Sequence, residues 1–470
     1  KVCWDPEGVF NARKIVNTPP MDTSLRYEVG DSDVACRTYF DFSKEKGWLC
    51  AIEQCNGSGD CRKSYAFGGT MCPSFRATRE ESHTTRARAN TLRELITHPR
   101  TKKIYDQREI LEVLDTCVSC KACKSECPSN VDIARFKAEF LQQHYDVCGV
   151  PMKAFLIARL TEIQRLGTIL PWFYNAIVRN RMTGNMLKRI LHFAPKRTIP
   201  TLYKTTLKHW LGRYRRKNRG ETVGKVFLFA DEFTNYMDVE IGIKMIELLD
   251  WLGYEVIIPK HVESGRTSIS KGMLKVAKGV ARENVLLLKD LVTENIPLVG
   301  IEPSCILSFR DEYPDLVGED LKEEAVRLGK NCLLYDEFFT REIRAGRIQA
   351  EQFTDQPLKI MLHGHCHQKS LASVEPSREM LSLPVNYSVE VIPSGCCGMA
   401  GAFGYEKKHY ELSMKIGEQV LFPAVRGAGE NVCISAPGTS CRQQIKDGTG
   451  KQALHPIEVL YEALKCTKEK

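Results

Sequence analysis

The stretch CVSCKACKSECP, residues 117–128, decides how the rest of the chain is interpreted. Its spacing, C-x2-C-x2-C-x3-C-P, lets three thiolates bind one iron–sulfur cube while the fourth, before proline, ligates a second cluster. A ribbon-type zinc site would need two separated C-x2-C pairs. Cysteines of an ordinary core do not follow this spacing, and here Lys121 and Lys124 stand between them. The stretch therefore predicts iron–sulfur ligation.

The composition is that of a globular protein of several domains. The chain has 470 residues, of which 43% are hydrophobic, 27% are charged and 19 are cysteines. Most cysteines fall in short metal-type spacings, which indicates cluster ligation in a reducing compartment and not a secreted disulfide fold. Residue 1 is Lys and no signal peptide is visible, so we expect a cytoplasmic location. The best membrane-span candidate, 150–178, is interrupted by four charged residues.

A stretched version of the same motif lies upstream, at 55–73. Cys55 and Cys61 occupy the first and third ligand positions, and Ser58 occupies the second. Cys72-Pro73 corresponds to the final Cys-Pro of the motif, after a long insert. Glycines in the motif let the backbone bend round inorganic sulfide and offer N–H donors to it. A predicted helix over 74–96 carries three arginines that could offset the charge of a thiolate-bound cluster: Arg79, Arg86 and Arg88.

The crossed-ligand rule divides the seven motif cysteines between two clusters. One [4Fe–4S] cluster is predicted to take Cys72, Cys117, Cys120 and Cys123. The other is predicted to take Cys55, Cys61 and Cys127, and is one thiolate short. Three solutions stay open for it: a [3Fe–4S] cluster, a non-cysteine ligand such as Ser58, or recruitment of Cys50 from outside the motif.

The region after the second motif is predicted to be helical. Apolar residues recur at helical spacing over 131–210, and a basic segment at 204–219 closes the region. Nucleic-acid binding is not expected, because the basic surface is narrow and no known module is present. A peripheral contact with the inner face of a membrane and a solvated linker are the two remaining interpretations of the basic segment.

Buried strands alternate with helices from residue 225 onward, which predicts parallel sheets. Strands are expected at 226–230, 254–259, 297–303, 359–363, 389–393 and 431–437. The third and sixth strands both end in proline followed closely by Ser-Cys, which indicates an internal duplication. The predicted fold class is α+β/α/β: a helical two-[4Fe–4S] module followed by two duplicated α/β repeats with parallel sheets.

Only the second copy carries enough cysteines for a cluster. Its candidate ligands follow different strands and gather where doubly wound sheets place their sites: Cys366, Cys396, Cys397 and Cys441. The adjacent Cys396 and Cys397 can direct two thiolates into one concave site. Alternatively, these two cysteines could form a vicinal disulfide. In the first copy, residues 263–266 (ESGR) replace Cys-Cys-Gly and only Cys305 is retained. The first copy is therefore not expected to hold a complete cluster.

Other residues near Cys366 have several interpretations. His363, His365 and His367 are candidate ligands, proton carriers or hydrogen-bond donors to a ligand. Cys433 is a further candidate ligand in the second copy.

Residues 359–441 resemble the cysteine-rich CCG domain of heterodisulfide reductase subunits and glycolate oxidase iron–sulfur subunits. The two cysteine motifs, with DEFTNY at 231–236, RDEY at 310–313 and GCCGMAG at 395–401, resemble a narrower group. In that group an FAD-linked oxidase is fused to this iron–sulfur half, and its members include D-2-hydroxyglutarate and D-lactate dehydrogenases. Residues 1–17 resemble the end of an FAD-linked oxidase C-terminal domain, although Ala12-Arg13 replace Pro-Gly.

The resemblance implies the electron-transfer part of a flavin-dependent D-2-hydroxyacid dehydrogenase, with FAD in an upstream domain. It implies two ferredoxin-type clusters and a further cluster at the CCG site, with a quinone, a cytochrome or a protein as acceptor. One alternative is a heterodisulfide-reductase-like enzyme with its chemistry at the CCG cluster, against which 263–266 argue. The other is a separate, non-catalytic iron–sulfur subunit, against which 1–17 argue.

The implied division of the chain has six parts. They are the FAD-domain tail at 1–17, a linker at 18–48, the two-cluster module at 49–145, a helical linker region at 146–222, a degenerate CCG repeat at 223–345 and a cluster-binding CCG repeat at 346–470.

Overall fold

The structure is a computed structural model that describes residues 3–11, 13–14, 17–23, 36–100, 104–218 and 220–465. Part of the predicted linker (24–35), part of the predicted tail (1, 2, 12, 15 and 16) and residue 219 of the basic segment lie outside these ranges. The chain divides into two units, Lys1–Arg37 and Thr38–Lys470. In the first unit the Asp5 carboxylate accepts the N–H groups of Val9 and Phe10 at 2.8 and 2.9 Å, which closes a turn.

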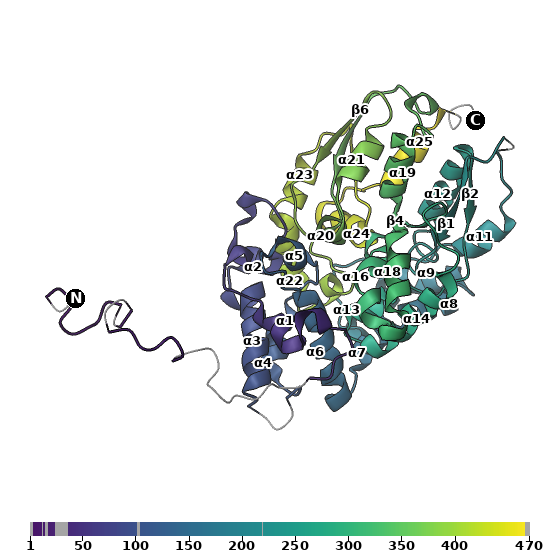
Figure 1. Ribbon diagram of the computed structural model, residues 1–470. Coiled ribbons are helices and arrows are strands. Elements are labelled where there is room, and N and C mark those ends of the chain that lie inside the picture. The colour runs from purple at the N-terminus through teal and green to yellow at the C-terminus, as the bar shows by residue number, and fades with distance from the viewer. Residues whose placement is uncertain are drawn as a thin grey trace. The chain divides into compact units, whose positions relative to one another are not determined.

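The second unit begins with a helical module (Figure 1). Its helices are α1 (Trp48–Glu53), α2 (Pro73–Thr78), α3 (Thr85–Thr97), α4 (Arg108–Asp115), α5 (Ala122–Glu126) and α6 (Ile133–Cys148), with short 3-10 turns at Ser43–Glu45, Asp60–Arg62, Tyr65–Phe67 and Glu81–His83. The helix predicted over 74–96 is broken between α2 and α3. Arg79 ends α2 in the left-handed conformation with φ 62°, and Thr84 caps α3 by accepting the Ala87 N–H at 2.9 Å.

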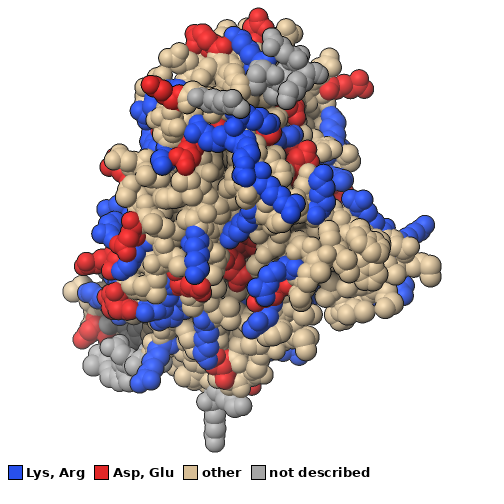
Figure 2. Space-filling model, turned by 90° about the vertical axis from the view of Figure 1, so that its right-hand side faces the viewer, with Lys and Arg blue, Asp and Glu red and all other residues tan. Residues whose placement is uncertain are grey.

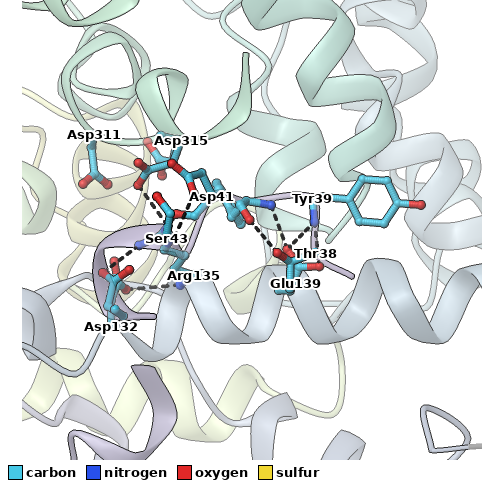
Figure 3. Close-up of polar contacts among 12 residues, drawn as sticks. Thr38, Tyr39, Asp41, Ser43, Asp132, Arg135, Glu139, Asp311 and Asp315 are labelled. Atoms are coloured by element: carbon cyan, nitrogen blue, oxygen red, sulfur yellow. Dashed lines mark hydrogen bonds and ion pairs between the residues drawn. The ribbon is translucent and has the colours of Figure 1, made fainter. Parts of the chain in front are cut away.

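The predicted linker at 18–48 is shorter than expected, because the packed unit already begins at Thr38. Phe40 and Phe42 are buried. Glu139 on α6 accepts the backbone N–H groups of Tyr39 and Phe40, each at 3.0 Å, and Arg135 donates to the Asp41 carbonyl (Figure 3). Residues 38–45 therefore pack across α6 and are held there by these hydrogen bonds.

Five helices fill the region between the module and the sheets: α7 (Met152–Ala158), α8 (Leu160–Gly167), α9 (Pro171–Arg179), α10 (Arg181–Ile190) and α11 (Leu207–Arg213). The basic segment is not a solvated linker, because Leu207 is buried, Arg216 pairs with Asp250 at 3.0 Å and Lys217 pairs with Glu247 at 2.7 Å. On the side of the molecule where α11 and β2 lie, Lys and Arg side chains are interspersed with Asp and Glu (Figure 2).

Two parallel sheets follow. The first has the order β2-β1-β3-β4, and the second has the order β6-β5-β7. The strands are β1 (Gly224–Phe229), β2 (Tyr254–Ile257), β3 (Leu298–Gly300), β4 (Cys332–Leu334), β5 (Leu358–Leu362), β6 (Tyr387–Val391) and β7 (Val432–Ser435). All six predicted strands are present. Sequence reasoning missed the short strand β4, which lies directly between the helices Lys322–Lys330 and Tyr335–Arg344.

Helices surround both sheets. Those of the first are α12 (Val239–Trp251), α13 (Arg266–Ser270), α14 (Leu274–Leu288), α15 (Pro303–Ile306), α16 (Ser308–Asp311), α17 (Tyr313–Leu316), α18 (Lys322–Lys330) and α19 (Tyr335–Arg344). Those of the second are α20 (Cys366–Leu371), α21 (Glu375–Leu381), α22 (Tyr410–Glu418), α23 (Leu421–Gly427), α24 (Thr439–Thr449) and α25 (Pro456–Glu462). One hydrophobic core joins both sheets, since Val226 and Leu228 share a cluster with Ile360 and Leu362.

Candidate iron–sulfur sites

Four cysteines of the helical module surround one internal cavity. They are Cys72, Cys117, Cys120 and Cys123, the set that the crossed-ligand rule assigned to one cluster. All four are buried. Burial raises the pKa of Cys120 and Cys123 well above the ordinary thiol value, so these side chains are poor thiolates without a metal partner.

Local backbone conformation explains how these cysteines converge. Cys72 is the N-cap residue of α2 and Pro73 is its first helical residue, which is the position proline prefers. Ser119 and Lys121 take positive φ values of 50° and 61°, so the chain coils tightly between Cys117 and Cys123. The Ser119 N–H points to the Cys117 sulfur at 3.5 Å.

Arg88 supplies a buried positive charge at this cavity. It is 1% exposed and donates to the Cys72 sulfur at 3.2 Å, the Val113 carbonyl at 3.1 Å and the Thr116 hydroxyl at 2.8 Å. Burial opposes its charge, but the neighbouring thiols raise the pKa of Arg88 above the ordinary value. Of the three arginines that the sequence singled out, Arg88 is the one that contacts a cavity cysteine. Arg86 instead pairs with Glu81 at 2.7 Å.

The second predicted set is only partly assembled. Cys61 is buried, and its pKa is raised by burial and by the nearby thiols of Cys72 and Cys55. Cys127 is half-buried at the C-terminal end of α5. Ser58 and Cys50, the two candidate substitutes for the missing thiolate, are both exposed. The ligand set of this site stays a prediction.

Four cysteines gather at the carboxyl ends of β5, β6 and β7. Cys366 begins α20, Cys396 and Cys397 lie in the loop after β6, and Cys441 lies in the first turn of α24. Their side chains form a row in which each sulfur interacts with the next, from Cys366 to Cys441. All are free thiols, so the vicinal disulfide is not formed.

Hydrogen bonds within the row shift the pKa values of its thiols in opposite directions. They lower the pKa of Cys366 to about 7 and that of Cys397 well below the usual value, and they raise the pKa of Cys396 and Cys441 well above it. Lys369, which the sequence did not single out, donates to the carbonyls of Ser394 and Gly395 at 2.5 and 3.2 Å and lies near all four thiols. Its position three residues after Cys366 was the signal in the sequence that could have identified it.

The three histidines have different environments. His363 bonds Ser394 Oγ through Nδ1 at 2.7 Å, and one of its nitrogens lies within 4.8 Å of the Cys397 and Cys441 sulfurs. Burial lowers the pKa of His363 to about 4, so it is neutral at pH 7. His365 caps α20 through its ring nitrogen, and His367 points to the Ser119 carbonyl at 3.0 Å. Cys433 stands apart on β7, packed against the shared core.

The two cysteine sites touch each other. Ser370 Oγ on α20 donates to the Cys120 carbonyl at 3.1 Å, and the Cys366 thiol contributes to the raised pKa of Cys120. Gly395 lies against the loop before Cys72, where an added Cβ would stand 3.3 Å from Thr70 Cα. Nothing in the sequence joins α20 to α5, so this contact was not predicted.

The corresponding edge of the first sheet holds a different group. Asp231, Glu232 and Cys305 are buried, with one ligand atom of each within 4.8 Å of the others. Their carboxylates are already bonded: Asp231 to Thr234, and Glu232 to the Ser264 N–H and hydroxyl at 3.0 and 2.7 Å. This edge therefore offers one sulfur and internally satisfied carboxylates.

A buried ion-pair network links that edge to the cavity cysteines. Lys121, between Cys120 and Cys123, pairs with Asp311 and with Glu312 at 3.0 Å. Arg266, after β2, reaches the same Glu312 at 2.5 Å. The side chains of Lys121, Asp311 and Glu312 are each less than 5% exposed.

The donor sets fit iron–sulfur clusters. Four buried thiols border a small cavity beside the buried Arg88 guanidinium, and four more form a row beside the half-buried Lys369. These two cations match the negative charge of thiolate-bound iron. The fold and these sites define an iron–sulfur protein. Residues 54–132 match a family model described as a 4Fe-4S dicluster domain.

The chain is similar to three kinds of curated proteins. It is 25% identical to the D-2-hydroxyglutarate dehydrogenase of Escherichia coli (strain K12), over 99% of this chain and 48% of that protein. It is 26% identical to an anaerobic glycerol-3-phosphate dehydrogenase subunit of the same organism, over 72% of this chain and 83% of that protein. It is 27% identical to lactate utilization protein A of Bacillus subtilis (strain 168), over 50% of this chain and 98% of that protein. The chain spans about half the length of the D-2-hydroxyglutarate dehydrogenases it matches.

Proposed function

We propose that this chain is the iron–sulfur electron-transfer part of a flavin-dependent D-2-hydroxyacid dehydrogenase, of the D-2-hydroxyglutarate or D-lactate type. The observation that carries the proposal is the contact between the two cysteine sites through α20. Sites that merely stabilise separate domains have no reason to touch, whereas centres that exchange electrons must lie close together.

In this proposal Cys72, Cys117, Cys120 and Cys123 hold one cluster, and Cys55, Cys61 and Cys127 hold the second. Cys366, Cys396, Cys397 and Cys441 hold a third. An iron–sulfur cluster bound at such a site accepts and releases one electron at a time. Arg88 and Lys369 balance thiolate charge, the N–H groups of Ser119 and Gly398 point to the Cys117 and Cys396 sulfurs, and the surrounding apolar core excludes water.

The same strand order supports a duplication. In both sheets the first strand is central, flanked by the second on one side and the third on the other. We take residues 223–345 as the degenerate repeat and 346–470 as the cluster-binding repeat. Residues 49–145 would form the two-cluster module, and 146–222 the region that connects it to the repeats.

FAD would belong to a flavin domain preceding this chain, on the same polypeptide or a partner subunit, because the D-2-hydroxyglutarate dehydrogenases that the chain matches are about twice as long. Electrons would leave for a quinone, a cytochrome or a protein acceptor. Among the described residues no helix combines the length and apolar character that crossing a bilayer requires. A peripheral membrane contact belongs to the proposal.

The cysteines of the CCG site are too buried for a reaction with a disulfide substrate. Cys366, Cys396, Cys397 and Cys441 are at most 8% exposed, and α20 is covered by α5. A disulfide substrate could not reach these sulfurs without separating the two modules.

Anaerobic purification with iron analysis and electron paramagnetic resonance (EPR) tests the proposal. The expected result is two ferredoxin-type signals, one of them three-iron if no fourth ligand is recruited, and a further signal from the CCG site. Together with its flavin domain the protein should reduce these centres with D-2-hydroxyglutarate or D-lactate. Stoichiometric zinc without iron, or centres that no D-2-hydroxyacid reduces, would contradict it.

A further inference from the structure

Helices α8, α9 and α10 expose an unusual amount of apolar surface. Leu166, Ile169, Leu170, Trp172 and Phe173, at the junction of α8 and α9, are each at least 52% exposed. Met182, Met186 and Ile190 on α10 are 83%, 64% and 63% exposed. Side chains of this size and number are rarely left in water on a monomeric protein.

The exposed residues are ordered as stripes. Met182, Met186 and Ile190 are spaced by four residues, so they line one face of α10. Ile163 and Leu166 on α8 and Leu170 just before α9 follow at spacings of three and four residues, and all three are exposed. The helices α9 and α10 pack against each other, and Gly184 allows the close approach, since an added Cβ would stand 2.7 Å from the Val178 carbonyl oxygen. The apolar stripes therefore belong to one helical layer.

The charges on this layer are mainly positive. Residues 163–190 contain Arg165, Arg179, Arg181, Lys188 and Arg189 and no Asp or Glu. The one acidic residue of the three helices, Glu162 at the start of α8, is paired with Arg159 at 3.3 Å. Short helices with an aromatic and aliphatic face and a mainly cationic flank lie in the plane of a membrane interface, where the apolar face enters the headgroup region and the cations meet anionic lipids.

We propose that the apolar layer formed by α8, α9 and α10 docks the protein onto an anionic lipid bilayer. This deepens the proposed function, on which it rests, by placing the peripheral membrane contact on these helices and not on the basic segment at 204–219. That segment makes ion pairs and core contacts with the first repeat. An acceptor dissolved in the bilayer would then be within the protein's reach.

Co-sedimentation with vesicles tests the proposal on the full chain. Wild-type protein should bind vesicles of phosphatidylcholine with 30% phosphatidylglycerol at least about tenfold more tightly than pure phosphatidylcholine vesicles, and salt should weaken the binding. The double substitution Trp172→Glu/Met186→Glu should weaken binding by a further factor of about ten or more. Val385→Glu, at a 73% exposed valine before β6, is the matched control and should bind like the wild type.

Several results would overturn the proposal: no binding to anionic vesicles, equal binding to both vesicle types, or equal loss of binding in the Val385→Glu variant. If vesicle binding disappears when a flavin-bearing polypeptide is added, the apolar layer is the docking surface for that polypeptide and not for the bilayer. Single substitutions at Ile169 and Met182, both strongly exposed, decide the matter if the double variant does not fold. The EPR signals report the proposed function separately, because vesicle binding does not require the clusters to be reducible.

Discussion

The carboxyl edges of the two sheets have the same topology and opposite chemistry. At the edge of β5, β6 and β7 four thiols lie in a row beside Lys369. At the edge of β1 and β3 a single thiol, Cys305, lies among the carboxylates of Asp231 and Glu232. Ser264 and Arg266 follow β2, where Cys396 and Cys397 follow β6.

The difference between the two edges shows that strand topology determines where a site lies, whereas the side chains determine its chemistry. Parallel strands bring their ends to one edge whatever the residues are, so both edges are buried polar pockets. At the edge of the first sheet the carboxylates of Asp231 and Glu232 accept hydrogen bonds from Thr234 and Ser264. Arg266 pairs with Glu312, which also pairs with Lys121. That edge therefore supports the loop of the cavity cysteines through ion pairs, whereas the second edge presents four thiols.

The largest expected contrast comes from removing one cysteine at each edge. Cys396→Ser should abolish the CCG-site EPR signal and lower the iron content, because a hydroxyl replaces one thiolate of the row. Cys305→Ser should leave the iron content and all signals intact. Iron analysis and EPR of both variants would test this. Loss of a cluster signal in Cys305→Ser would remove the distinction between the two sheet edges.

The buried ion pairs of Lys121 should contribute measurably to the free energy of unfolding. Lys121→Met leaves Asp311 and Glu312 short of a buried partner, and breaking such a network typically destabilises by about 3–5 kcal/mol. Lys124→Met is the control, because that side chain pairs with the same Asp311 but is 38% exposed, so its loss should matter by about 1 kcal/mol or less. Denaturant unfolding of the iron-loaded proteins measures both. If the two substitutions lowered the free energy of unfolding equally, the buried ion pairs of Lys121 would contribute no more to stability than the exposed pair of Lys124.

A smaller effect is expected on the potential of the CCG-site cluster. Removing the Lys369 charge favours the less negative, oxidised state, so the midpoint potential in Lys369→Met should fall by roughly 100 mV at an effective dielectric constant of about 20. Lys359→Met, exposed on β5 of the same sheet, should leave the potential unchanged. EPR-monitored redox titration measures the shift. A rise in potential would show that Lys369 does not act through its charge.

The smallest effect is a pH dependence of stability that arises at the edge of the first sheet. Burial raises the pKa of Asp231 to about 8 from an ordinary value of 3.8. The folded protein then keeps a proton that the unfolded chain releases, so this group's contribution to stability is lost as pH rises from about 4 to 8.

Asp231→Asn cannot ionise, so its stability should fall less steeply across this range and should exceed that of the wild type at pH 8 by about 1–2 kcal/mol. Asp320→Asn, at a carboxylate paired with Arg282 on the surface, should keep the wild-type slope above pH 5. Unfolding midpoints measured between pH 5 and 8 test this pair. An unchanged slope in Asp231→Asn would show that the carboxyl is ionised in the folded protein.

Local patterns in the sequence predicted much of this architecture. Cysteine spacing alone placed Cys72 with Cys117, Cys120 and Cys123, and buried alternation with helices located six strands. Contacts between distant segments could not be predicted, because no local pattern encodes them. These include the packing of α20 on α5, the strap of residues 38–45 on α6, and the Lys121–Glu312–Arg266 network. The break between α2 and α3 was missed because Arg79 adopts a left-handed conformation that non-glycine residues rarely take.

The most direct test of the account concerns the two sites that touch. EPR of the fully reduced, iron-loaded protein should show spin–spin splitting between the cluster held by Cys72, Cys117, Cys120 and Cys123 and the cluster held by the row from Cys366 to Cys441. The splitting should vanish in Cys396→Ser while the signal of the first cluster persists. Two fully loaded sites with no magnetic interaction between them would contradict the electron-transfer arrangement proposed here.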